Sequence, residues 1–402
     1  MSAAPMNLFL LPFSLGASSR RLIADSYKEP LSAALSQSKS PEHPATLIIA
    51  VVGDFLHQAA TSDPSAKRIS WPDAQSILAG LYSLVAYICA QQSIATDLNA
   101  GPNSVDARVV FVQDDRPGVS GHDENELNET IIQSLSGFAS RGGSPDSIFY
   151  LKSEEGLRLV DSYAAHIKGG RPAVESRLIG LDCSVATQDG SSPQPVRSSS
   201  SQYQVVCLGG TFDHLHLGHK LLLSAAALLL RISGSPESRS RFIIGVTGDE
   251  MLKNKKFAEY VQPWDVRARG VLEFLHTVFD HPTHGEPTLS SPRPGELVGS
   301  FRGGAVVVEC VVFQDLYGPT VTIEAMDALV VSGETRSGGK AVNDKRREQG
   351  WKELDVYEVD VLDARGLTDA DPTQTTEGFG TKISSTAIRQ EKAAECSGTG
   401  RL

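Results

Sequence analysis

The chain has 402 residues, of which 40% are hydrophobic and 21% charged, and it carries a net charge of −11 with a pI near 5.4. This length suggests two domains, and the composition is typical of a folded globular protein. The acidic balance argues against a nucleic-acid-binding protein, which normally has a basic surface, but it leaves room for a locally positive pocket that binds an anion.

The five cysteines are odd in number, widely spaced and never in a C-x-x-C pattern. This usage is typical of a protein in a reducing compartment and argues against a disulfide framework or a zinc site. We therefore expect the protein in the cytoplasm, with the nucleus as a second location. No apolar run reaches the roughly 18 residues of a membrane span. The apolar stretch Met6–Phe13 has no preceding basic residue, so we interpret it as a first strand. A mitochondrial leader is the alternative, since Arg20 and Arg21 precede the first acid, Asp25.

The first half alternates segments of strand and helix character and predicts an α/β domain over residues 1–187. The expected elements are a strand at Leu47–Val52, a helix at Asp73–Gln92, a strand at Arg108–Val112, a helix at Asn125–Phe138 and a strand at Ser147–Leu151. No pattern of chemical groups is recognisable there, so this domain receives no function. Residues 188–202 read QDGSSPQPVRSSSSQ, which is typical of a linker.

The second half predicts a nucleotide-binding domain over residues 203–395, with a short tail at 396–402. Strands and helices alternate here, which predicts a Rossmann-like, doubly wound parallel sheet with ligands beyond the carboxyl ends of its strands. The Pro-, Gly- and Ser-rich stretch at 281–304 is expected to be a surface insertion. The expected strands are Val205–Leu208, Phe242–Val246, Ala305–Phe313, Ala328–Val331 and Tyr357–Val361, and the expected helices include Gly218–Arg231 and Gly339–Gln349.

The first chemical motif is GGTFDHLHLGH, at residues 209–219, between a predicted strand and a predicted helix. Gly209 and Gly210 let the backbone approach a phosphate, and the N–H groups of the helix start point toward it. Within the motif, His216, Gly218 and His219 form the H-x-G-H pattern of nucleotidylyltransferases and class I aminoacyl-tRNA synthetases. Two imidazoles around a glycine can donate hydrogen bonds to an α-phosphate as charge develops on it.

The second motif is KISSTAIR, at residues 382–389, where hydroxyl side chains at a helix start can bind triphosphate oxygens and Arg389 can add a cationic fork. A lysine cluster, Lys253, Lys255 and Lys256, follows a predicted strand end. We expect one of them to reach the phosphates and choose Lys255. The stretch SGETRSGGK at 332–340 is no P-loop, because Glu334 stands where a glycine is required and Ala341 replaces the Ser/Thr that binds Mg²⁺.

Together with VQPWDVRARGVLEFL, DLYGP and VVSGETRSGGKAVN, these motifs closely resemble the phosphopantetheine adenylyltransferases of eukaryotes and archaea, over roughly residues 205–390. The resemblance implies that Thr211 and Phe212 face the phosphate of phosphopantetheine, and that His219, supported by His216, stabilises the reacting α-phosphate. It implies that the ATP phosphates are held by Ser384, Ser385, Thr386 and Arg389. More loosely, it implies nucleotide or substrate contacts at Glu334, Thr335 and Arg336.

The implied reaction joins ATP and 4′-phosphopantetheine into dephospho-coenzyme A and pyrophosphate, with Mg²⁺ arriving on the triphosphate and no protein metal ligand named. A cytidylyltransferase for a phosphorylated alcohol and a nucleotide-binding regulator without activity are the alternatives. A class I synthetase fits less well, because little chain follows the second motif. No kinase P-loop follows, so the reaction is expected to stop at dephospho-coenzyme A. We expect no nucleic-acid or membrane partner. We expect the first half to be dispensable for the chemistry, and association with other enzymes of coenzyme A synthesis is a candidate role for it.

Overall fold

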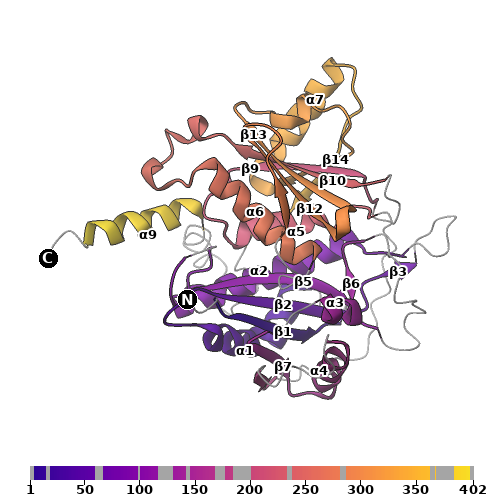
Figure 1. The fold of residues 1–402 in the computed structure, drawn as a ribbon, viewed down its shortest axis with the longest axis vertical. Helices are drawn as coiled ribbons and strands as arrows, with labels where there is room; N and C mark the ends of the chain where they lie inside the picture. Colours follow the sequence, from indigo (N-terminus) through magenta and orange to yellow (C-terminus); the bar gives the residue numbers. More distant parts are fainter. Residues whose placement is uncertain are drawn as a thin grey trace.

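The computed structural model describes residues 4–14, 19–58, 67–97, 100–115, 130–141, 145–167, 177–183, 201–232, 238–280, 287–362, 367 and 384–398. These residues form two large β-sheets, one from each half of the chain, with helices between and outside them (Figure 1). The α/β fold class predicted from the sequence is confirmed. The expected linker lies almost entirely outside the described residues.

The sheet of the first half has six strands, all parallel, in the order β6-β5-β2-β1-β7-β8. Its strands are β1 (Met6–Pro12), β2 (Ala45–Gly53), β5 (Val105–Gln113), β6 (Gln133–Ser134), β7 (Ser147–Leu151) and β8 (Arg177–Leu181). A separate small hairpin pairs β3 (His57–Gln58) with β4 (Lys67–Arg68). Every residue of β5 is buried, which is what a parallel strand covered on both faces requires.

Two pairs of helices cover this sheet. The pair on one face is α1 (Arg20–Ser38) and α2 (Trp71–Gln92), which pack on each other, and the pair on the other face is α3 (Leu135–Arg141) and α4 (Glu154–His166). By length and composition α2 could cross a membrane, and it is the only described helix that could. However, 72% of its apolar window is buried inside the molecule. We therefore interpret α2 as a core helix.

The helix expected at Asn125–Phe138 begins only at Leu135. The part of this prediction before Thr130 lies outside the described residues, and β6 occupies positions where helix was expected. The Asp115 carboxylate accepts hydrogen bonds from the backbone N–H groups of Leu135 and Ser136, at 3.1 and 2.6 Å. Because these are the first orphan donors of α3, Asp115 fixes where the helix starts, and only the tertiary structure brings it there.

The sheet of the second half has seven strands in the order β11-β12-β13-β10-β9-β14-β15, and the five strands from β13 to β15 are parallel. The strands are β9 (Val205–Gly210), β10 (Ser240–Thr247), β11 (Thr288–Ser290), β12 (Glu296–Phe301), β13 (Val306–Phe313), β14 (Ala328–Ser332) and β15 (Asp355–Val359). The chain moves outward from β9 in both directions. A topological switch point therefore lies between β9 and β14, as a doubly wound nucleotide-binding sheet requires.

The stretch expected as a surface insertion is instead part of this sheet. Residues 281–286 lie outside the described residues, but β11 and β12 form a hairpin that extends the sheet antiparallel to β13. The side chain of Phe301 is 1% exposed and packs on the ring of Phe279, at 5.6 Å between centroids. Alternating burial along β12 explains why glycine and proline content alone gave the wrong prediction.

Helices α5 (Leu217–Ala227) and α6 (Trp264–Phe279) cover the face of this sheet that is turned toward the first half, and α7 (Arg336–Glu348) covers the other face. The last helix, α9 (Ser385–Gly398), projects from the body of the molecule (Figure 1). A short 3₁₀ turn, η3 (Ala258–Tyr260), lies between β10 and α6 and contacts α9.

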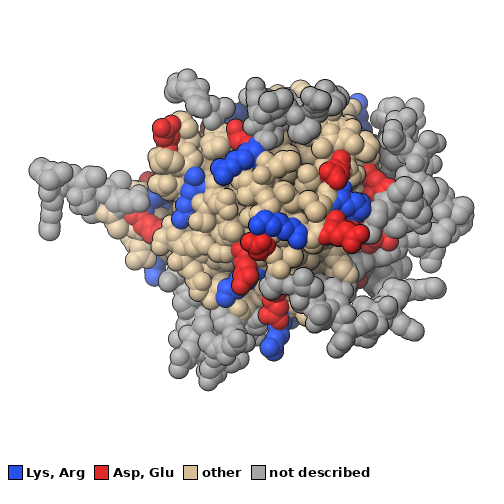
Figure 2. Space-filling view, turned by 90° about the horizontal axis from the view of Figure 1, so that it is seen from below, with Lys and Arg blue, Asp and Glu red and all other residues tan. Residues whose placement is uncertain are grey.

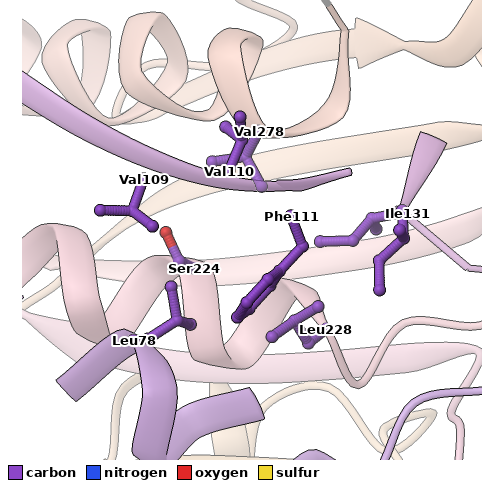
Figure 3. Close-up of a pocket in the computed structure, with 9 residues that line it drawn as sticks. Leu78, Val109, Val110, Phe111, Ile131, Ser224, Leu228 and Val278 are labelled. Carbon is purple, nitrogen blue, oxygen red and sulfur yellow. The ribbon is translucent and has the colours of Figure 1, made fainter. Parts of the chain in front are cut away.

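The two halves share one hydrophobic core. Helix α2 packs on α5, and both α5 and α6 pack directly on β5, so side chains from both halves form one continuous cluster. The indole Nε1 of Trp71 donates to the Ala225 carbonyl across this interface, at 2.8 Å. The interface also holds a small cavity of about 20 Å³, room for about one water molecule, lined by β5 and helices α2, α5 and α6 (Figure 3). This packing conflicts with the expectation that the first half is dispensable.

The outer surface of the first half carries mixed charge. Seen from below, the described part of this face shows Lys and Arg interspersed with Asp and Glu over a mostly uncharged surface (Figure 2). Lys28 and Glu29 lie together in a shallow groove along α1. A nucleic-acid surface needs clustered basic side chains, and this face of the described residues presents none.

Candidate functional site

The candidate site lies at the carboxyl ends of the parallel strands in the second half. The GGTFDHLHLGH segment leaves β9, and the neighbouring β14 ends at Ser332 on the other side of the switch point. Loops after β10 and β13 reach the same edge because those strands run parallel to β9. The topology therefore gathers several of the sequence motifs along one edge.

The loop after β9 has an unusual backbone. Phe212 and His214 both have positive φ angles, 52° and 45°, which non-glycine residues adopt only when the surroundings enforce them. The buried Phe212 ring lies over Gly210, where an added Cβ would come within 2.9 Å of the ring. Gly210 is therefore required for close packing within the loop as well as for access to a ligand.

Asp213, which belongs to the motif but had no predicted role, holds this loop. Its side chain is fully buried and accepts a hydrogen bond from the Gln262 backbone N–H at 2.9 Å. It also forms an ion pair with Arg389 at 2.5 Å, and its backbone carbonyl accepts from the Ser385 hydroxyl at 2.9 Å. Asp213 thus joins the two motifs, which lie about 170 residues apart in the sequence.

The two histidines of H-x-G-H lie at the start of α5. His216 caps the helix, since its Nδ1 accepts from the Gly218 N–H at 3.2 Å, and its ring stacks on that of His219 at 3.9 Å between centroids. His219 Nδ1 is buried and has no hydrogen-bond partner among the described residues. The ring of His219 also contacts that of Phe212, at 5.3 Å.

Both imidazoles are neutral at pH 7. Burial lowers the pKa of His219 to about 4, although the Asp213 carboxylate opposes the shift. Burial, together with the nearby His219 and Lys220, holds the pKa of His216 well below its ordinary value. Because Nδ1 of His216 accepts a hydrogen bond, the proton of its neutral ring is on Nε2. Each ring therefore offers one N–H donor without adding a positive charge.

Helix α9 carries the second motif, and all four of its candidate side chains are already engaged within the protein. Ser384 caps the helix by accepting from the Ala387 N–H at 3.3 Å, Ser385 donates to Asp213, and Thr386 accepts from Arg389 at 3.1 Å. Lys382 and Ile383 lie outside the described residues. The hydroxyl groups that were proposed to bind phosphate thus lie next to the loop after β9.

Arg389 does not present a free guanidinium. It is 3% exposed, pairs with Asp213 and donates from Nε to the Lys256 carbonyl at 3.0 Å. The role inferred for it, a direct contact to ATP phosphates, would require this buried ion pair to break. We therefore revise its role: Arg389 docks α9 against the loop and against the lysine segment.

The lysine cluster separates into different environments. Lys253 is exposed and paired with Glu250 at 2.5 Å, whereas the side chains of Lys255 and Lys256 are exposed and have no ion-pair partner among the described residues. The Lys256 backbone is fixed through Arg389. This arrangement leaves Lys255, the lysine chosen from the sequence, available to an anionic ligand.

The candidates after β14 lie across the switch point from the glycines. Glu334 and Thr335 are exposed, and Thr335 forms a capping box with Ser332. Arg336 starts α7 and forms a two-pronged ion pair with Glu358, at 2.5 and 2.8 Å. No described contact connects these three residues to the histidines, so only a ligand that spans the edge would bring them together.

Arg267 is a buried residue of this site that was not predicted from the sequence. Its guanidinium donates to the carbonyls of Thr211 and Thr247, at 2.6 and 2.7 Å, and pairs with Asp249 at 2.6 Å. It thereby fastens the loops after β9 and β10 to each other. The sequence did contain a signal for this residue. Arg267 lies four positions before Val271 and therefore on the apolar face of the same helix, and a cation that is buried there needs polar partners.

Among the described residues, no group of three or more His, Cys, Asp and Glu side chains could hold a metal ion. The site instead offers neutral N–H donors, hydroxyl groups, a helix N-terminus without acidic residues in its first turn, and an exposed lysine. These are groups that bind and polarise phosphate.

Comparison with known proteins agrees with this chemistry. Residues 207–391 match the cytidylyltransferase-like family, and residues 1–187 match a domain of unknown function (DUF8446). Phosphopantetheine adenylyltransferase of Saccharomyces cerevisiae is 36% identical over 191 residues, which are 48% of this chain and 49% of the yeast protein. The matched region thus spans about half of that relative's length.

The archaeal relatives are covered more fully. Phosphopantetheine adenylyltransferase of Pyrococcus horikoshii is 31% identical over 188 residues, which are 47% of this chain and 89% of the archaeal protein. A solved structure of a protein with unknown function from Archaeoglobus fulgidus is 28% identical and covers 39% of this chain and 99% of its own, with a TM-score of 0.27. The second half contains a nucleotidyltransferase-like domain, and through it the chain belongs to the phosphopantetheine adenylyltransferase family.

Proposed function

We propose that the second half transfers the adenylyl group of ATP to 4′-phosphopantetheine and releases dephospho-coenzyme A and pyrophosphate. The observation that carries the proposal is the pair of stacked histidines in the first motif, which Asp213 joins to the second motif at one sheet edge. The similarity to adenylyltransferases over almost the whole archaeal protein supports the choice of substrates.

In the proposed reaction, an oxygen of the phosphopantetheine phosphate attacks the α-phosphorus of ATP. A new P–O bond forms as the bond to the β-phosphate oxygen breaks, and pyrophosphate leaves with that electron pair. The attacking phosphate is already ionised near pH 7, so the reaction needs alignment and charge stabilisation more than a strong base.

The residues of this chain serve these two needs. A neutral His219 donates a hydrogen bond to the α-phosphate as negative charge builds there, and His216 holds the ring of His219 by stacking. The N-terminus of α5 adds its positive dipole end, and Lys255 reaches the outer phosphates. Mg²⁺ would accompany the triphosphate, held by phosphate oxygens and water, and would neutralise part of its charge.

The test is a pyrophosphate-release assay of the full chain with ATP and 4′-phosphopantetheine, run beside the same assay with CTP and choline phosphate or ethanolamine phosphate. Formation of dephospho-coenzyme A and pyrophosphate in equal amounts supports the proposal. Turnover with CTP alone would make the protein a cytidylyltransferase, the rival that the matched family's description favours. Nucleotide binding without turnover with any donor would indicate a regulator.

The product pattern sharpens the assay. Phosphorylating the ribose of dephospho-coenzyme A would need a second ATP site that aims the γ-phosphate at the 3′-hydroxyl, and such kinases use a P-loop. With excess ATP the product should therefore stay at dephospho-coenzyme A. Coenzyme A that appears in proportion to the purified protein would contradict this part of the proposal.

A further inference from the structure

A buried lysine connects the catalytic motif to the first half of the chain. Lys220 directly follows His219 in α5, and its side chain is fully buried, which is rare for lysine without a paired charge. Its ammonium group donates to the carboxylate of Asp106 and, at 3.0 Å, to the carbonyl of Thr96. Both acceptors belong to the first half.

Asp106 is itself fixed from a second direction. It accepts from Nε and Nη2 of Arg108, at 2.8 and 2.6 Å, and Arg108 in turn donates to the hydroxyl of Thr277 on α6 at 2.6 Å. Burial raises the pKa of Asp106, but Arg108 and Lys220 more than offset this and hold it at about 2. The network thus crosses the interface between the halves twice, and its central carboxylate, Asp106, is ionised at neutral pH. Burial lowers the pKa of Lys220 below its ordinary value, and the Asp106 carboxylate opposes this shift.

A second contact falls on the loop itself. The buried carboxylate of Asp97 lies 3.9 Å from Nδ1 of His214, within the GGTFDHLHLGH segment. On its other side His214 bonds the Tyr260 carbonyl through Nε2 at 2.9 Å. Asp97 is the neighbour of Thr96, so one short segment after α2 bonds the first turn of α5 through Thr96 and contacts the loop through Asp97.

We propose that the first half, through Thr96, Asp97 and Asp106, is the positioning partner of the H-x-G-H histidines and thereby sets the rate of turnover. The inference rests on the proposed adenylyl transfer. None of these residues reaches the site edge. They act through Lys220, which directly follows His219 in α5, and through His214, which lies in the loop that leads to α5. A displacement of about 1 Å at a reacting group can cost about a hundredfold in rate.

The test compares two positioning variants with a matched control in the full chain. Lys220→Met removes the ammonium group but leaves Asp106 paired with Arg108, so no charge is left alone. Asp97→Asn keeps the shape and removes the charge. Trp71→Phe removes another hydrogen bond between α2 and α5, but its acceptor, Ala225, lies at the far end of α5 from His219.

Thermal midpoint, kcat, the KM for each substrate and the ¹⁵N imidazole shifts of the histidines are measured for each variant. We expect Lys220→Met to lower kcat by about tenfold or more with KM for ATP little changed, and Asp97→Asn to cause a smaller fall in the same direction. Trp71→Phe should lower the thermal midpoint and keep the wild-type kcat. If the Lys220→Met protein does not fold, the kcat of Asp97→Asn tests the inference in its place.

A folded Lys220→Met or Asp97→Asn protein with wild-type kcat would overturn the inference, and so would an equal loss of kcat in Trp71→Phe. Wild-type protein that releases no pyrophosphate overturns the proposed function alone. In that case the imidazole shifts still test the positioning role. A shift of the His219 resonance in Lys220→Met but not in Trp71→Phe supports this role, and unchanged His219 resonances in both variants contradict it.

Discussion

The two halves of the molecule have sheets of the same core order. In the first half β5-β2-β1-β7-β8 are parallel, and in the second half β13-β10-β9-β14-β15 repeat that arrangement, each with a switch point beside its central strand. The difference lies in the residues at the carboxyl ends of the strands. Strand β9 ends in a glycine pair, and the helix after it is capped by His216 and has no acidic residue in its first turn.

The first half fills the corresponding positions differently. The strand that corresponds to β9 is β1, which ends at Pro12 rather than in a glycine pair, and the helix after it, α1, is capped by Ser19 and has no acidic residue in its first turn. Neither helix start carries a carboxylate that would repel a phosphate, so the difference between the two positions is the glycine pair and the two histidines beside α5. The comparison teaches that a doubly wound sheet provides a place for an anion, whereas the residues at its strand ends decide whether one can bind.

The largest expected effect comes from separating the halves. A chain that begins at Ser198 would expose the faces of α5 and α6 that now pack on α2 and β5, and it would leave the Lys220 ammonium without Asp106. We expect insoluble or misfolded protein, because the apolar side chains that now form the shared core would face water. Soluble yield, circular dichroism and pyrophosphate release measure this. A soluble, fully active fragment would show that the halves are independent.

The next largest effect tests whether the chemistry belongs to the second sheet alone. His219→Ala should lower kcat by about 10²–10³, with nucleotide affinity little changed, because its hydrogen bond strengthens only in the transition state. His166→Ala is the control, since His166 lies exposed at the end of α4 in the first half. Near-normal turnover of His219→Ala would remove this histidine from the mechanism.

A moderate effect is expected from pH. The pKa of His219 is about 4 in the folded protein, against an ordinary value of 6.5, so the unfolded chain binds the proton more readily between these values. The contribution of the neutral His219 to the free energy of unfolding is therefore fully present above about pH 6.5, and it is lost as the pH falls toward about 4. Urea unfolding at about pH 7 and about pH 5 measures the loss, which should be smaller in His219→Gln. Equal losses in both proteins would assign the pH dependence to other groups.

The smallest effect concerns the exposed lysines. Lys255→Ala should raise the KM for ATP by no more than about fivefold, because a solvated lysine contributes little to binding an anion. Lys253→Ala, which removes a lysine already paired with Glu250, should leave KM unchanged. Steady-state kinetics at low and high salt measure both. If only Lys253→Ala raises KM, the choice between the two lysines is wrong.

The sequence predicted the fold class because its signals are local. Alternating apolar strands and amphipathic helices give a doubly wound sheet, and the GGTFDHLHLGH motif comes after its central strand as expected. Glycine and proline content was a poor guide at 281–304, where the alternation of buried residues in β12 was the better signal. The predicted start of the helix that contains Leu135 was wrong, because the carboxylate of Asp115 sets where this helix begins and lies 20 residues earlier in the sequence.

The sequence by itself indicated which residue types are candidates to bind a phosphate: the glycine pair, the two histidines and the hydroxyl motif are readable because their spacing is short. Tertiary structure alone decided which of these groups are free. It placed Arg389 in a buried ion pair with Asp213 and buried Lys220 against Asp106. Such pairs join residues more than 100 positions apart, and the energy of a buried charge depends on partners that no local pattern specifies.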